Sequence, residues 1–151
     1  MKDSKKVWVW VGVAIVVIVV IVWMIVASRS TPKPAALGPT PVFAAQGQLT
    51  PQFPKSLILD TNAAISGSYS VNYATSTNQY TAEYNSSSTV SALYQDYQSY
   101  LPQNGWVIIS SLTTDPTFNA IAASEGNNRL QVVINAQSGG SQVIVSYLAK
   151  Q

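Results

Sequence analysis

An unbroken apolar segment at residues 7–27 constrains this chain more than any other feature of its sequence. Its 21 residues include no charged residue and no proline, and valine and isoleucine supply 14 of them. A helix of this length spans about 30 Å, the thickness of the hydrocarbon core of a bilayer, and a lone span in lipid must be helical to pair its backbone groups. Tryptophans, which favour the headgroup regions, stand near its two ends: Trp8, Trp10 and Trp23. The segment is predicted to be a transmembrane helix.

A cleaved signal peptide is the alternative for this segment, because Ile25-Val26-Ala27 could serve a signal peptidase. The apolar run is far longer than the roughly 7–15 residues of a signal peptide core, which favours an uncleaved signal anchor. Three lysines precede the segment, and Arg29 and Lys33 follow it. This bias predicts that residues 1–6 are cytoplasmic and that the rest of the chain lies outside the cytoplasmic membrane.

Residues 28–54 differ abruptly in composition from the segment before them. Six of the eight prolines fall here, and each proline removes a backbone donor and fixes φ, so no long helix or central strand is expected. The stretch is predicted to be a semi-extended tether. A proline-rich ligand for another domain is the alternative, and it depends only on the short runs 32–34 and 39–41.

The distribution of charge separates this N-terminal part from residues 55–151. Residues 1–54 carry five basic residues and one acidic residue, whereas residues 55–151 carry three basic and five acidic residues. The net charge of +2 therefore comes from the flanks of the apolar segment, and the C-terminal domain is mildly acidic. Such a domain lacks the basic surface that nucleic acid binding requires.

Hydrophobic periodicity predicts the fold of residues 55–151. Apolar and polar residues alternate over 65–73 and again over 80–84, which indicates a β-hairpin. Apolar residues then recur at three- and four-residue spacing over 90–101, as on one face of an amphipathic helix, and Pro102 marks its end. Four strand-like runs follow, at 106–110, 118–123, 130–134 and 143–147.

Ser87 or Ser88 is expected to cap the start of the helix. Short turns between the four strand-like runs indicate an antiparallel meander. The predicted fold is α+β, of order β-β-α-β-β-β-β, with one helix packed on one face of an antiparallel sheet. The other face is then solvated or covered by a partner. It is predicted to be mostly neutral and polar, and its candidate interaction residues are Ser66, Ser68, Asn72, Gln131, Val133 and Asn135.

The junction between the helix and the next strand carries a resemblance to a known group of proteins. In the sequence YQSYLPQNGW, Tyr97 and Leu101 close the helix four residues apart, and Gly105-Trp106 opens the strand. This resembles small bacterial extracytoplasmic α+β domains of unknown function, which often follow a lipoprotein signal or a single-pass anchor. The resemblance covers about residues 53–150 and implies their fold and their tethering, but no catalytic residues. The chain has no cysteine to carry a lipid, which agrees with a transmembrane anchor.

Residue content narrows the chemistry that the chain can perform. Without histidine or cysteine it has no imidazole base, no thiol nucleophile and none of the usual zinc ligands. The few carboxylates of the domain fall in turns or on exposed positions without a motif around them, and no Ser–Lys pair has S-x-x-K spacing. No calcium loop or phosphate loop is present. No catalytic residue, metal or cofactor is predicted.

These observations favour a non-enzymatic, membrane-anchored extracytoplasmic module that serves protein binding or envelope assembly. Its expected partners are the lipid bilayer and an envelope protein or a second copy of the chain. A pilin-like or secretion-apparatus subunit is the alternative, although no processing site of glycine plus an acidic residue accompanies the apolar run. An envelope-associated hydrolase is the third possibility, and it would require two carboxylates converging in a cleft.

Overall fold

The computed structural model describes residues 38–73 and 76–150. The predicted cytoplasmic residues 1–6, the predicted transmembrane segment 7–27 and the first part of the predicted tether lie outside the described residues. Within the part that the structure describes, no helix is both long enough and apolar enough to cross a membrane. The compact unit that holds the sheet begins at Pro39.

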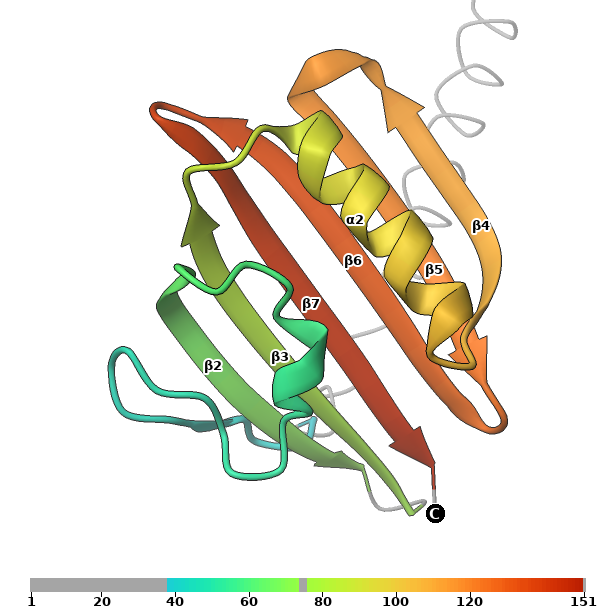
Figure 1. Ribbon diagram of the computed structural model, residues 1–151. Coiled ribbons are helices and arrows are strands. Elements are labelled where there is room, and N and C mark those ends of the chain that lie inside the picture. The colour runs from blue at the N-terminus through green and yellow to red at the C-terminus, as the bar shows by residue number, and fades with distance from the viewer. Residues whose placement is uncertain (1–37, 74–75, 151) are drawn as a thin grey trace, which may run out of the picture. The chain divides into compact units, whose positions relative to one another are not determined.

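One antiparallel sheet of seven strands and one α-helix form this unit in the described residues (Figure 1). The strands are β1 (Val42–Phe43), β2 (Ala64–Tyr73), β3 (Thr77–Ser86), β4 (Val107–Thr114), β5 (Phe118–Glu125), β6 (Asn128–Gln137) and β7 (Gly140–Lys150). The helix α2 (Val90–Gln103) joins β3 to β4, and two 3₁₀ turns, η1 (Lys55–Leu57) and η2 (Asp115–Thr117), lie in the connections. The strand order is β1-β2-β3-β7-β6-β5-β4, which places β7 in the centre. The predicted antiparallel α+β architecture is confirmed.

The structure has one strand more than the sequence predicted, because part of the predicted tether joins the sheet. Val42 and Phe43 pair with β2 at its outer edge, and Phe53 is buried with only 3% of its surface exposed. Prolines exclude a segment from the centre of a sheet but allow a short edge strand, whose missing donors face solvent. The proline content of residues 39–54 therefore limited β1 to two residues without preventing it from pairing.

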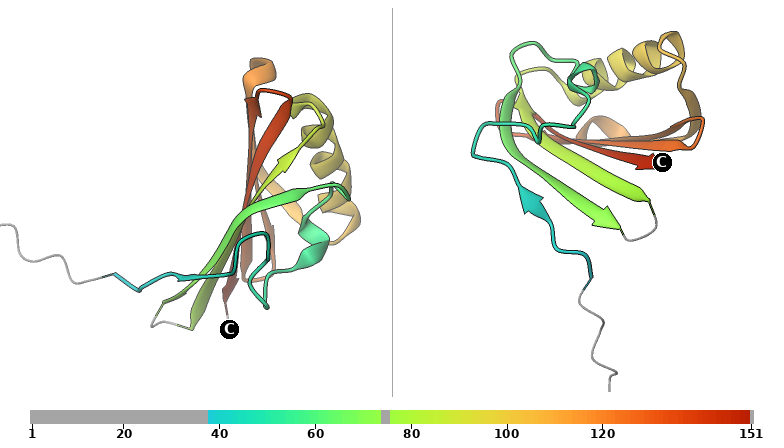
Figure 2. Two further views of the ribbon diagram at one scale, coloured as in Figure 1. Left: turned by 90° about the vertical axis from the view of Figure 1, so that its left-hand side faces the viewer. Right: turned by 90° about the horizontal axis from the view of Figure 1, so that it is seen from below.

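The hydrophobic core lies between the sheet and a layer made by α2 and the η1 segment, which cover the same face (Figure 2). The helix buries one stripe, Val90, Leu93, Tyr97 and Leu101, at the three- and four-residue spacing that the sequence predicted. The opposing strands contribute buried residues such as Ile121, Val132 and Val145. The other face of the sheet carries neither α2 nor η1.

Hydrogen bonds of two fully buried tyrosines connect α2, η1 and β3 within the core. The hydroxyl of Tyr97 on α2 donates to the carbonyl of Leu57 in η1 at 2.7 Å, and it lies 3.0 Å from the hydroxyl of Tyr84 on β3. Because Tyr97 has a single hydroxyl proton, the Tyr84 hydroxyl is the donor in their mutual bond. A phenylalanine at position 97 would leave the buried Leu57 carbonyl without this hydrogen-bond donor, so the packing of α2 against η1 favours a tyrosine at this position.

The helix is capped one residue later than the sequence indicated. Neither Ser87 nor Ser88 is the cap: the hydroxyl of Thr89 accepts a hydrogen bond from the amide of Ala92 at 3.2 Å. We expect Thr89→Ala to lower the free energy of unfolding by about 1 kcal/mol, because one amide of the first turn loses its acceptor. Chemical denaturation measures this loss. Thr89→Ser keeps the hydroxyl and should retain most of the stability, so an equal loss in both variants would contradict the capping role.

Candidate functional site

A β-bulge in β2 divides the predicted interaction residues between the two faces of the sheet. The pairing register shifts between Ile65 and Gly67, so one extra residue enters β2 and the alternation of its side chains is reversed beyond that point. Ser68 consequently pairs with Ala82 and faces the core, where it is only 4% exposed, and its hydroxyl donates to the backbone carbonyl of Thr81. The prediction that Ser68 lies on the open face is therefore wrong.

The other predicted residues follow from the same register. Asn72 lies four residues beyond Ser68 and so shares its side of the strand, although at the exposed end of β2. Ser66 is exposed within the bulge. The three predicted residues on β6 are Gln131, Val133 and Asn135, which alternate with the buried Leu130, Val132 and Ile134. Of the six predicted residues, these three share the face opposite the helix. The structure thus brings three of the six predicted residues together.

The face opposite α2, here called the open face, is more apolar than predicted. Three large exposed apolar side chains of this face come from β4: Val107, Ile109 and Leu112 are 66%, 58% and 55% exposed. The register continues this surface inward, because Leu112 pairs with Ala120, Ala120 with Val133 and Val133 with Ile144. Sequence analysis missed Leu112 because the predicted strand ended at residue 110. The two threonines after Leu112, Thr113 and Thr114, favour a strand and were the available signal.

Shallow hollows cross the open face. One of about 430 Å³ is lined by Ile109, Ala122, Gln131 and Leu148 among others, and a smaller one of about 90 Å³ includes Leu112. A third hollow, of about 370 Å³, lies at the end of the face that holds Arg129 and Lys150. The largest hollow shares lining residues with each of the other two, so an apolar surface with a basic end runs across β4 to β7.

Among the described residues the strand β4 is also an edge of the sheet, because only β5 pairs with it there. Its sequence VIISSLTT contains no charged residue and no proline, which are the usual protections of an edge strand against pairing with another chain. A bulge between Ile108 and Ser110 interrupts its register with β5. The open face and the β4 edge therefore adjoin one another at the same strand.

A second concave region, here called the aromatic cleft, lies on the helix side of the sheet. It has a volume of about 220 Å³, and its lining includes Tyr100 and Asn104 from the end of α2, Trp106, Glu125 at the end of β5, and Tyr147 on β7. The Tyr147 ring stacks on Tyr80 with centroids 6.2 Å apart and meets Trp106 edge-on at 6.1 Å. Burial and the nearby Glu125 carboxylate raise the pKa of Tyr147 above its ordinary value.

The carboxylates of the described residues are dispersed rather than convergent. Asp60 accepts a hydrogen bond from Ser86, Glu83 accepts one from Gln142, and Asp96 is exposed on α2. In the part of the chain that the structure describes, no group of three or more carboxylates could hold a metal ion. Glu125 is the one described carboxylate that lines a cleft together with aromatic side chains.

Comparison with known proteins gives one match. The fold is that of a small α+β domain. Residues 67–140 match the model of a START domain-like family. The match runs from the interior of β2 to the first residue of β7 and covers slightly less than half of the chain. No curated protein and no solved structure matches the chain. The junction motif at residues 97–106 falls inside the matched region and stays a prediction.

Proposed function

We propose that this chain is a non-enzymatic, single-pass membrane-anchored module, with residues 1–6 in the cytoplasm and the α+β domain outside the membrane, and that it binds a protein partner of the envelope through its open face. The observation that carries the proposal is that three apolar residues of β4, Val107, Ile109 and Leu112, are each more than half exposed. Contiguous exposed apolar surface of this kind, rimmed by polar residues, is typical of protein interaction sites.

The composition of the open face supports a protein partner. The centre of a protein interface is typically apolar and poor in charge, whereas its rim is polar. The middle of the open face carries the apolar residues Ala120, Ala122, Val133 and Ile144 together with the neutral polar residues Gln131 and Ser146, and Arg129 and Lys150 lie toward its basic end. A partner that presents an apolar patch beside an acidic group would complement both parts.

The proposal predicts that a charge at Leu112 strongly weakens partner binding. We expect Leu112→Lys to lower crosslinking in native membranes at least about ten-fold, because a desolvated ammonium in an interface costs more than 1.4 kcal/mol. Lysine is tolerated on exposed edge strands, so the free energy of unfolding should change by less than about 0.5 kcal/mol. Mass spectrometry of the crosslinked full chain measures the yield of each partner.

The matched control adds the same charge elsewhere. Gln95 is exposed on α2, so Gln95→Lys should leave the crosslinked partner unchanged. Recovery of the chain alone before mutation, or equal recovery of a partner with Leu112→Lys and the original chain, would overturn the proposal. Crosslinking of two copies would identify the partner as the chain itself.

A further inference from the structure

The aromatic cleft combines features of a recognition site that the open face does not share. Three aromatic side chains, Tyr100, Trp106 and Tyr147, line it, and Glu125 is the only charged residue among its described lining. The electron-rich faces of aromatic rings and a carboxylate both attract positive charge. The cleft therefore favours positively charged ligands over negatively charged ones.

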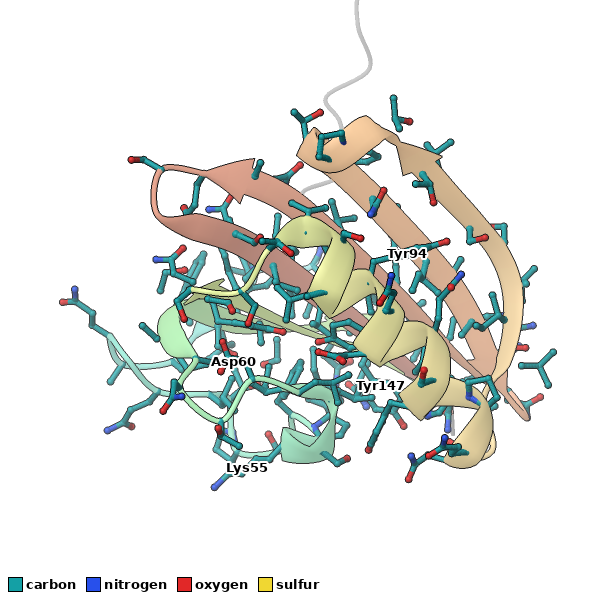
Figure 3. The ribbon with its side chains drawn as sticks, turned by 45° about the horizontal axis from the view of Figure 1, so that its top comes forward. Lys55, Asp60, Tyr94 and Tyr147 are labelled. Carbon is teal, nitrogen blue, oxygen red and sulfur yellow. The ribbon has the colours of Figure 1, made fainter. Side chains whose placement is uncertain are left out.

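No basic side chain of the described residues neutralises Glu125. The nearest in sequence, Arg129, donates its guanidinium to the carbonyls of Gly126 and Asn128 at 3.2 and 3.0 Å. Lys55 belongs to η1 beside the cleft, but it lines a separate hollow with Gly47 and Leu49. Figure 3 shows its side chain directed away from Tyr147. The positive charge that would complement the cleft has to come from a ligand.

The electrostatics at Tyr147 agree with this arrangement. The pKa of its phenol is raised first by burial and then by the Glu125 carboxylate, so the carboxylate acts on the interior of the cleft although Glu125 itself is exposed at the end of β5. An anionic ligand would meet the same repulsion that disfavours the tyrosinate. Polar groups beside the rings, the Ser56 hydroxyl and the Asn104 side chain, can accept hydrogen bonds from a donor such as an ammonium.

We infer that the aromatic cleft binds an alkylammonium group, with the carbon chain against the rings of Trp106 and Tyr147 and the charge toward Glu125. The volume of about 220 Å³ is smaller than the roughly 300–1,000 Å³ of pockets that enclose whole ligands. The cleft therefore takes one aliphatic amine group rather than a large molecule. The inference is independent of the proposed function, because the cleft and the open face lie on opposite sides of the sheet.

Trp106 provides the readout. The chain contains four tryptophans, and Trp8, Trp10 and Trp23 lie in the predicted anchor. Replacing these three with phenylalanine in the full chain, held in an uncharged detergent, leaves Trp106 as the only indole. Butylammonium should change its fluorescence saturably, whereas 1-butanol, which has a similar shape and no charge, should bind much more weakly at the same ionic strength. Equal affinity for the alcohol would overturn the inference, since the cleft would then be merely apolar.

A pair of carboxylate variants tests the position of the charge. Glu125→Gln should weaken butylammonium binding about five-fold, the effect expected of removing one partly exposed charge partner. Asp96→Asn removes a carboxylate from the exposed face of α2 and should leave the affinity unchanged. Equal weakening in both variants would show a general effect of net charge and would contradict a specific site. Loss of the fluorescence change in Tyr147→Leu, with the thermal transition retained, would further support it.

Two sources of the amine can be distinguished by the same titration. A blocked lysine amide represents a lysine side chain of a protein, and 1,4-diaminobutane represents a free amine. Tighter binding of the lysine amide would assign the cleft to a protein ligand, and tighter binding of the diamine would assign it to a small metabolite. Either result supports an alkylammonium site, and failure of both together with butylammonium would overturn it.

Discussion

Replacing Gly140 with alanine is expected to destabilise the domain by about 3 kcal/mol, because strain and overpacking add at this position. Gly140 opens β7 with a φ of 152°, a conformation that side-chain-bearing residues rarely adopt. A Cβ atom there would lie 2.0 Å from the backbone oxygen of Ser86 and 2.9 Å from the Cα atom of Ser87. The backbone of the chain leading into α2 passes directly over Gly140, and neither segment can move without disturbing the β3–β7 pairing.

Gly139→Ala is the matched control for this prediction. Gly139 also has a positive φ, 83°, but a Cβ atom there would meet nothing within 4 Å. Its substitution should cost only about 1 kcal/mol, the penalty of a left-handed conformation. Chemical denaturation of the full chain compares the two variants. Equal losses would mean that backbone conformation alone, and not the contact with Ser86, sets the requirement for glycine at position 140.

The second large effect is a loss of stability in alkaline solution. Burial raises the pKa of Tyr84 from 10.0 to about 12, and it raises the pKa of Tyr97 well above 10.0. Between these values the unfolded chain has lost a phenolic proton that the folded chain retains, so unfolding releases protons and stability falls as the pH rises. Tyr84 alone is expected to account for a loss of about 2 kcal/mol between pH 10 and 12, and Tyr97 adds to it.

This prediction is tested by measuring the free energy of unfolding across that range together with tyrosinate absorbance. Absorbance from the two buried tyrosines should appear only as the domain unfolds. Tyr84→Phe removes one of the two ionising groups and leaves the bond from Tyr97 to Leu57 in place, so its stability should fall less steeply above pH 10 than that of the original chain. Parallel pH profiles for the two proteins would contradict the assignment.

The fold could be predicted from the sequence because each element repeats its own period. The alternation along β6 and the stripe on α2 that ends at Leu101 are local patterns, and the structure confirms both. The bulge in β2 has no such pattern: Ile65, Gly67 and Tyr69 read as one continuous alternation, whereas the inserted residue sends Tyr69 to the open face, where its ring lies 5.6 Å from Phe43. A shift of one residue leaves the strand prediction intact and reverses which side chains are buried.

The candidate sites depend on pairings that no local pattern reveals. The rings of Tyr80 and Tyr147 stack because β7 inserts between β3 and β6, so the last of the described strands pairs with the hairpin β2–β3. Trp106 and Glu125 reach the same cleft from the start of β4 and the end of β5. The sequence indicated each of these residues as part of a strand or turn, but their convergence is a property of the strand order.

The central position of β7 also orders the events of folding. Until β7 has been made, the hairpin β2–β3 and the meander β4–β6 have no strand between them, and one edge of each stays unpaired. Pairing between segments so distant along the chain carries a loop-closure cost that slows folding. If the domain is delivered across a membrane from its N-terminus, it completes its sheet only after β7 has emerged. A chain that stops before Gly140 leaves two incomplete sheets, each with an unpaired strand edge that can pair with another chain.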